Sequence, residues 1–163
     1  MKRMSGWILA AFIISMALPA ASVAQTGEPL YLLAAKDSRV QAQKWIDFLK
    51  QYDQPVEHYV LSEIDQVKKQ DYVVVVGGLD EPGFRDILLE IVGNDEVASI
   101  ENGDKGKMLL KKDVWKPGQM VLVFAGKNTD AAAEARSASK DKWMDYLEEW
   151  FDLEEIPGGL RAY

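Results

Sequence analysis

A run of four valines is the feature that most constrains what this chain can fold into. The run, Val73–Val76, has Tyr72 before it and Gly77-Gly78 after it. Side chains branched at the β-carbon favour the extended backbone over the helix, and a strand without polar residues has to be covered on both faces. We therefore expect residues 71–78 to form a central strand of a sheet. The two glycines allow a tight turn where this strand ends.

The remainder of the chain predicts strands and helices that alternate. The other strands are predicted over residues 29–35, 56–61, 97–100, 107–111 and 120–126. Helices are predicted over residues 40–52, 62–69, 81–92 and 129–151. In these helices apolar residues recur three and four positions apart. The order predicts an α/β fold of three layers, in which a mainly parallel sheet has helices on both faces.

The expected sheet also has an antiparallel hairpin edge, made by residues 97–100 and 107–111. A glycine-rich connection separates the two segments, which is typical of a hairpin or a bulged loop. Four lysines lie around it, namely Lys105, Lys107, Lys111 and Lys112. Lysine hinders an exposed sheet edge from pairing with other chains, so we expect these residues to mark the edge of the sheet.

The N-terminus has the order of a secretory signal. Lys2 and Arg3 precede an apolar run over residues 7–18, and the small residues Ser22 and Ala24 follow it. The apolar run of about 12 residues is shorter than the roughly 20 that a membrane-spanning helix needs. We therefore expect cleavage after residue 24 and no stable membrane insertion of the mature chain.

The sequence accordingly divides into three parts. Residues 1–24 are expected to be a secretory signal peptide, residues 25–152 a single α/β domain, and residues 153–163 an irregular C-terminal tail. A chain with such a signal is expected to be exported, to the periplasm, the cell surface or the extracellular space.

The composition argues against several classes of site. The chain has no cysteine and one histidine, His58. Disulfides, thiol nucleophiles and zinc sites built from cysteine or histidine are therefore not expected. The 26 acidic and 19 basic residues give a net charge of −7, which argues against nucleic acid and anionic membranes as partners. We expect neither a metal site nor a cofactor.

Catalytic chemistry also lacks a sequence signature. No serine lies in a G-x-S-x-G motif, and His58 lies in a short predicted strand between Glu57 and Tyr59. The acidic clusters are typical of solvated faces and helix ends rather than of a catalytic pair of carboxylates. We therefore expect no catalytic residue and no enzymatic activity.

The two turns that follow the most apolar strands are the best place for a ligand. Ligands of open α/β sheets gather at the carboxyl ends of strands, and backbone N–H groups at helix starts hold anions. The spacing matches neither G-x-G-x-x-G nor a phosphate-binding loop, and tight structural turns explain the same residues. The candidate ligand-binding residues are Gly77, Gly78, Asp80, Gly126, Asn128 and Thr129.

Two tryptophans are candidate interface residues. Trp115 lies in a predicted turn beside Pro117, where an aromatic side chain is hard to bury. Trp150 shares a helical stripe with Trp143 and Tyr146. Aromatic residues at that spacing usually face the core, so a partner-binding stripe is the second interpretation.

One stretch of the chain resembles a known family. The strand that ends in Gly77-Gly78 is followed by the turn Trp115-Lys116-Pro117-Gly118, a strand that ends in Ala125-Gly126, and an alanine-rich helix. Over residues 71–135 this order resembles the α/β modules of archaeal surface-layer proteins and their secreted relatives. The resemblance implies a structural or interaction role in the cell envelope and no enzymatic activity.

Two main hypotheses for function follow, and a third is that the acidic loops bind calcium or another divalent cation. The first is an exported, non-enzymatic interaction protein of the cell envelope or extracellular space, which binds a protein partner or associates with itself. The alternative is a small-molecule module for an anion or a nucleotide-like ligand, or a Rossmann-like enzyme, that uses the two glycine turns.

Overall fold

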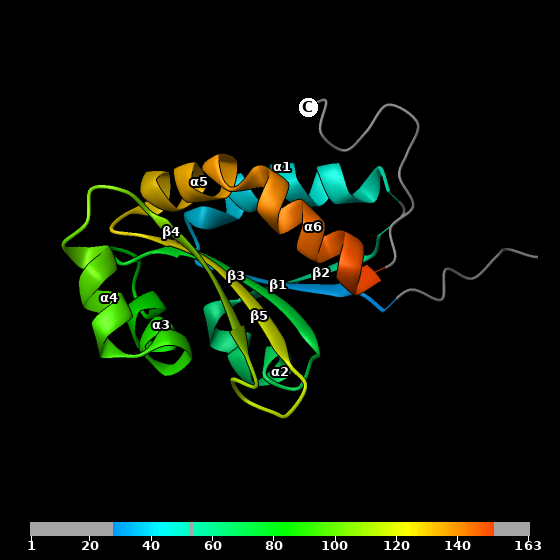
Figure 1. Cartoon of the computed structure of the whole chain (residues 1–163), viewed down its shortest axis with the longest axis horizontal. Helices are drawn as coiled ribbons and strands as arrows, with labels where there is room; N and C mark the ends of the chain where they lie inside the picture. The colour runs from blue at the N-terminus through cyan, green and yellow to red at the C-terminus, as the bar shows by residue number, and fades with distance from the viewer. Residues whose placement is uncertain (1–27, 53, 152–163) are drawn as a thin grey trace, which may run out of the picture.

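The computed structural model of the chain describes residues 28–52 and 54–151 (Figure 1). The expected signal peptide and C-terminal tail lie outside these residues. In the described ranges, no helix combines the length and the apolar content that crossing a bilayer requires.

Five strands of the described chain form a single sheet. They are β1 (Leu30–Ala34), β2 (Val56–Val60), β3 (Tyr72–Gly78), β4 (Lys107–Lys112) and β5 (Met120–Gly126). Their order across the sheet is β2-β1-β3-β5-β4. All neighbours are parallel except β4, which runs antiparallel to β5 at one edge. The mainly parallel sheet and its antiparallel edge are thus confirmed.

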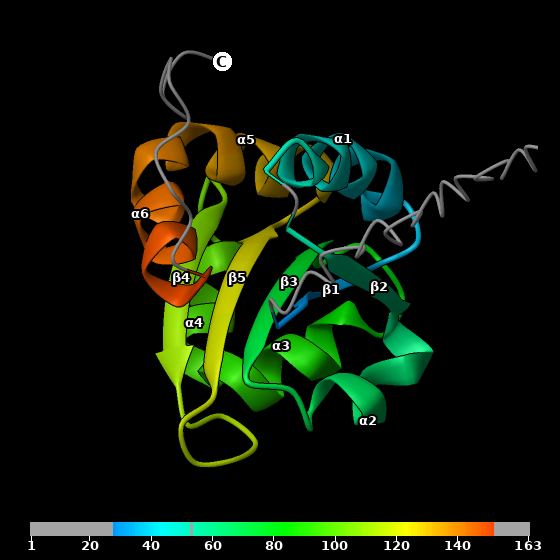
Figure 2. The ribbon, with the colours of Figure 1, turned by 90° about the vertical axis from the view of Figure 1, so that its right-hand side faces the viewer.

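Helices cover both faces of this sheet. Those of the described residues are α1 (Ser38–Lys50), α2 (Ile64–Val67), α3 (Phe84–Val92), α4 (Asn94–Glu101), α5 (Thr129–Ala138) and α6 (Lys140–Phe151), with a 3-10 helix, η1 (Leu61–Glu63), before α2. Figures 1 and 2 show α1, α5 and α6 on one face and α2, α3 and α4 on the other. The three expected layers are present.

The four valines supply both halves of the core. Side chains alternate across a strand, so Val74 and Val75 point to opposite faces of the sheet. Val74 belongs to the cluster under α1 and α6, where Trp45 and Trp143 pack edge-to-face with ring centroids 5.3 Å apart. Val75 belongs to the cluster under α3 and α4, together with Phe84. The central, doubly covered position of β3 follows from the sequence as expected.

The predicted strand over residues 97–100 is wrong. These residues belong to α4, and β4 pairs with β5 instead. Gly93 ends α3 with a φ of 82°, and α4 begins at the next residue. Val97 and Ile100 are both buried in the same cluster, and a separation of three residues places two side chains on one helical face. The lysine-rich strand β4 is nevertheless an edge strand, as expected.

The predicted single helix over residues 129–151 is two helices. The chain leaves helical geometry at Ser139, with φ −107° and ψ 21°. The Ser139 Oγ donates to the Ala135 carbonyl at 2.6 Å, and the Trp143 Nε1 donates to the Arg136 carbonyl at 2.9 Å. Side-chain donors thus satisfy carbonyls at the end of α5, and α6 leaves in a new direction across the sheet (Figure 1).

Candidate functional site

The two glycine turns lie side by side, as the sequence predicts for neighbouring strands. Gly78 of β3 is in register with Gly126 of β5, and the Leu79 N–H donates to the Gly126 carbonyl at 2.9 Å. The Asn128 side chain caps α5 by accepting from the Ala131 N–H at 2.9 Å. The sequence therefore located this end of the sheet correctly.

The same turns are closed by their own packing. A Cβ atom on Gly77 would collide with the ring of Phe84. One on Gly78 would lie 2.5 Å from the carbonyl carbon of Asn128 and the nitrogen of Thr129, and one on Gly126 would lie 2.5 Å from a backbone nitrogen of α5. These glycines let the chain approach itself closely, so a structural requirement explains them without a ligand.

Glu81 lies at the point where a sheet of this topology is best suited to bind an anion. The helices that follow β1 and β3 lie on opposite faces of the sheet. The carboxyl ends of these two strands therefore form a topological switch point. The carboxylate of Glu81 is directed to this point and reaches the start of α1. Its Oε1 accepts from the N–H groups of Asp37 at 2.8 Å and Ser38 at 3.0 Å. Its Oε2 accepts from the Ser38 Oγ at 2.6 Å and the Gly78 N–H at 2.8 Å.

The chain thus supplies its own anion to the start of α1. Glu81 is 5 % exposed and Ser38 is fully buried, and α1 has no cap from the Asp37 side chain. The carboxylate replaces that missing cap and links the start of α1 to the end of β3. It also explains why α3 begins at Phe84 rather than at residue 81, since Glu81 belongs to the preceding turn.

Sequence reasoning placed Glu81 at a helix start and missed this role. Its partners at the start of α1 lie 43 and 44 positions away, and no local sequence pattern predicts a contact over that separation. Asp80, a predicted ligand-binding residue, is exposed in the same turn. The hydroxyl of Ser38 is used by Glu81, so it is not positioned as a nucleophile beside His58.

The loop between β4 and β5 has a different character, because it is both exposed and rigidly held. Asp113 adopts a left-handed backbone conformation with φ 55°, and its carboxylate accepts from the Gly118 N–H at 2.6 Å. The Asp113 N–H donates to the Gln119 carbonyl at 2.8 Å. A non-glycine residue in this conformation persists only where the surroundings impose it.

Gln119 is the internal anchor of this loop. Its side chain is fully buried. The amide nitrogen donates to the carbonyls of Lys68 at 3.2 Å and Gln70 at 2.7 Å, and the amide oxygen accepts from the Trp115 N–H at 3.1 Å. One buried side chain therefore joins the loop to the segment between α2 and β3. No local sequence pattern singles out Gln119, because its partners on that segment lie 49 and 51 positions away.

Trp115 is half-buried, because it packs against the edge of the cluster under α3 and α4. Its Nε1 donates to the Glu90 Oε1 at 3.0 Å, and the same oxygen accepts from the Lys68 Nζ at 2.7 Å. The Lys68 ammonium lies 5.7 Å from the centre of the indole ring, which is within the range of a cation–π interaction. The Lys116 Nζ donates to the Lys69 carbonyl at 2.7 Å and pairs with Asp71.

A surface groove opens beside this tryptophan. It is lined by Asp65, Lys68, Lys69, Trp115 and Lys116. We call these residues the Trp115 groove. Asp65 and Lys69 are exposed, and their side chains form no hydrogen bond or ion pair with another described residue. The groove therefore offers an oriented aromatic ring, one ammonium and one carboxylate to a partner.

Trp150, the second candidate interface residue, packs mainly against the chain itself. Its ring stacks on Tyr72 with centroids 5.3 Å apart and on Tyr146 at 6.3 Å. It borders the core cluster under α6. The aromatic stripe of α6 therefore belongs mainly to the core, which agrees with the first interpretation rather than with a partner-binding stripe.

The one histidine of the chain is His58. His58 lies on β2, and its Nε2 is buried without a hydrogen-bond partner among the described residues. Burial lowers the pKa of His58, the nearby charge of Arg39 adds to this lowering, and Glu63 opposes it. No group of three histidine, cysteine or carboxylate side chains in the described ranges could hold a metal ion.

Comparisons of the chain with protein families, with curated proteins and with solved structures gave no significant match.

Proposed function

We propose that this chain is an exported, non-enzymatic protein of the cell envelope or extracellular space, similar in role to surface-layer modules, and that it acts by binding a protein partner. The proposed contact surface is the Trp115 groove together with the loop that carries Trp115. The observation that carries the proposal is the hydrogen bond to the buried side chain of Gln119 that holds a partly exposed tryptophan in the loop.

Preorganisation is the physical argument. Tryptophan is among the residues that contribute most to binding at protein interfaces, and a side chain fixed before binding loses little entropy in the complex. Here Glu90 fixes the indole nitrogen and Gln119 fixes the backbone of the same residue.

The alternative, a small-molecule site at the glycine turns, has weaker support. Phe84, Asn128 and the start of α5 fill the space beside the three glycines, and Glu81 satisfies the start of α1. An anionic ligand would have to displace this carboxylate and break its four hydrogen bonds. The geometry therefore favours a binding surface at the other end of the sheet.

Site-specific photo-crosslinking in the native envelope fraction tests the proposal. A photoreactive residue would replace Lys69 in the groove, and the matched control would carry it at Lys50, which is exposed on α1. We expect mass spectrometry to identify a reproducible neighbour at position 69 and none at position 50. A protein recovered without any neighbour from position 69, or with the same background from both positions, would contradict the proposed contact surface.

The export half of the proposal has its own test. Signal cleavage predicts that the protein from the envelope fraction begins at Gln25. Intact-mass measurement reads this directly. A chain that retains residues 1–24 and remains inside the cell would contradict export without bearing on the groove.

A further inference from the structure

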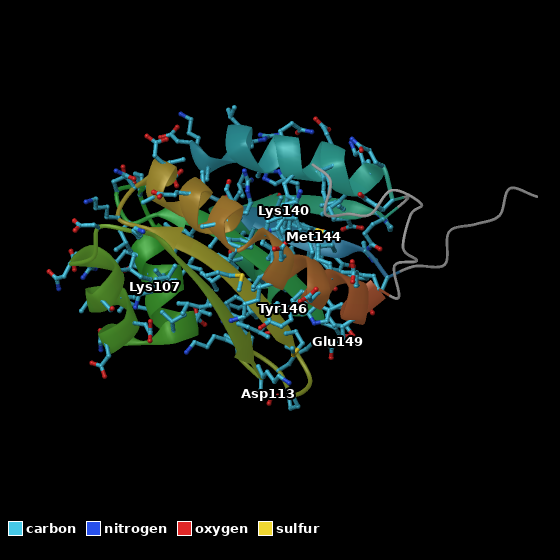
Figure 3. All side chains as sticks on the ribbon, turned by 45° about the horizontal axis from the view of Figure 1, so that its top comes forward. Lys107, Asp113, Lys140, Met144, Tyr146 and Glu149 are labelled. Carbon is cyan, nitrogen blue, oxygen red and sulfur yellow. The ribbon has the colours of Figure 1, made fainter. Side chains whose placement is uncertain are left out.

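The outer edge of β4 is unpaired in the described structure. β4 pairs with β5 on its inner side and is the last strand of the sheet. Alternate N–H and C=O groups along Lys107–Lys112 therefore point away from the sheet, as on any edge strand. Figure 3 shows Lys107 and Asp113 at the two ends of this edge.

The middle of this edge is apolar and incompletely covered. Met108 and Leu110 border the core cluster under α6, and Leu109 borders the cluster under α3 and α4. All three side chains are only partly buried. A further strand beside β4 would remove more of their apolar surface from water on both faces of the sheet.

The ends of the same edge are positively charged, although the chain as a whole carries a net charge of −7. Lys105 precedes β4, while Lys111 and Lys112 end it. None of these three ammonium groups forms a hydrogen bond or an ion pair with another described residue. Lys107 differs, because it contacts Glu96 and Ser99. The opposite edge strand, β2, contains no lysine.

These charges discriminate between possible occupants of the edge. Two copies of this chain paired through β4 would bring lysines close to lysines, and like charges on neighbouring strands are destabilising. An acidic segment would instead meet charges of opposite sign. The lysines therefore reject a second copy and favour an acidic strand.

We propose that the β4 edge accepts an extended acidic segment of a partner protein as a sixth strand. The segment has an apolar centre that covers Met108, Leu109 and Leu110, and acidic residues at its ends that face Lys105, Lys111 and Lys112. The main-chain hydrogen bonds supply affinity, and the alternating side chains supply specificity. This inference rests on the proposed interaction function, since the edge runs directly into the loop that carries Trp115.

Binding of a labelled peptide to the full chain tests the inference. The probe is fluorescein-labelled Glu-Glu-Val-Ile-Val-Glu-Glu, whose symmetric ends suit either strand direction, and fluorescence anisotropy reports binding. We expect the double variant K111E/K112E to bind at least about tenfold more weakly, because two favourable pairs become repulsive ones. The control K36E/K50E makes the same change in net charge on and before α1 and should bind the peptide with little change.

Backbone methylation separates strand addition from simple charge attraction. Two further peptides carry N-methyl groups on one or the other alternate set of amides. A peptide added as a strand uses one set only, so one methylated peptide should lose binding and the other should retain it. Hydrogen exchange should show new protection in β4 and none in β2. Equal binding of both methylated peptides would overturn strand addition, and so would binding of dextran sulfate without binding of the peptide.

Failure of this inference leaves a distinct signature from failure of the proposed function. If the peptide does not bind but position 69 still crosslinks to a reproducible neighbour, the groove is the contact surface and β4 is not. If neither experiment gives a result, both proposals fall.

Discussion

At the scale of single residues, Glu81 shows how one carboxylate can determine what a sheet end is able to do. It accepts hydrogen bonds from Asp37, Ser38 and Gly78. These groups lie around the place where a ligand would otherwise be held. A carboxylate in this position stabilises the fold and occupies the hydrogen-bond donors that an anionic ligand would need.

Glutamine in place of Glu81 tests this role. The amide of E81Q would direct N–H groups toward donors that now point at a carboxylate. We expect the free energy of unfolding to fall by about 2–3 kcal/mol, the range for hydrogen bonds to a buried charged group. Urea denaturation measures this change. The control is E134Q on the exposed surface of α5, and an E81Q midpoint equal to that of E134Q would contradict the assigned role.

His58 should make stability depend on pH. Burial lowers its pKa in the folded protein below the ordinary value of about 6.5 that holds in the unfolded chain. The unfolded chain therefore binds more protons, so the contribution is fully present above about pH 6.5 and is lost as pH falls through the folded-state pKa. Arg39 and Glu63 are the charged groups that act on it.

The measurement compares urea denaturation of the natural chain and H58Q at about pH 7.5 and about pH 5.5. The loss of stability on acidification should be smaller in H58Q, because glutamine does not titrate. Identical losses in the two proteins would show that carboxylates, rather than His58, cause the whole pH dependence.

At the scale of elements, the β4–β5 loop depends on a contact that crosses the fold. Gln119 joins Trp115 to the carbonyls of Lys68 and Gln70. The variant Q119L leaves these buried backbone groups without partners, so we expect a loss of about 2–4 kcal/mol in unfolding free energy. Hydrogen exchange should also become faster at the Trp115 amide than elsewhere.

The matched control is Q66L, which changes an exposed glutamine on α2. Unchanged exchange at the Trp115 amide in Q119L would mean that the loop is held by Asp113 and Gly118 alone. Gln119 would then not be what preorganises Trp115 for binding.

The elements also show where sequence patterns suffice and where they do not. The strand β3 was predictable because four valines leave no alternative that buries them. The helix α4 was not predictable, because Val97 and Ile100 in a segment this short fit a strand or a helix. Gly93 and the burial of both side chains in the cluster under α3 and α4 decide between the two. The break at Ser139 was likewise not predictable from the apolar pattern, since it depends on hydrogen bonds from the Ser139 and Trp143 side chains to carbonyls near the end of α5.

At the scale of the whole molecule, the sequence located the two adjoining glycine turns but not their closure. Glu81 and Gln119, which decide the character of the two ends of the sheet, act through contacts more than 40 positions away. Such contacts leave no local periodicity. The charge distribution, by contrast, could be read directly, since three lysines lie within the six residues of β4, and that strand is an edge strand.

The same lysines should keep the molecule from associating with itself. Replacing the two that end β4 with threonine, in K111T/K112T, removes the repulsion and raises the strand propensity of the edge. We expect this variant to dimerise or aggregate through β4, and sedimentation velocity over a range of concentrations measures it. The control K36T/K50T makes the same change in charge away from the sheet edge.

The result also bears on what the edge is for. A variant that associates shows that the lysines prevent β4 from pairing with a second copy, which is the condition for keeping this edge open to an acidic partner. If K111T/K112T remains monomeric at every concentration at which K36T/K50T does, then lysine charge does not control access to β4. The proposed pairing of the partner's acidic residues with these lysines would then have no support.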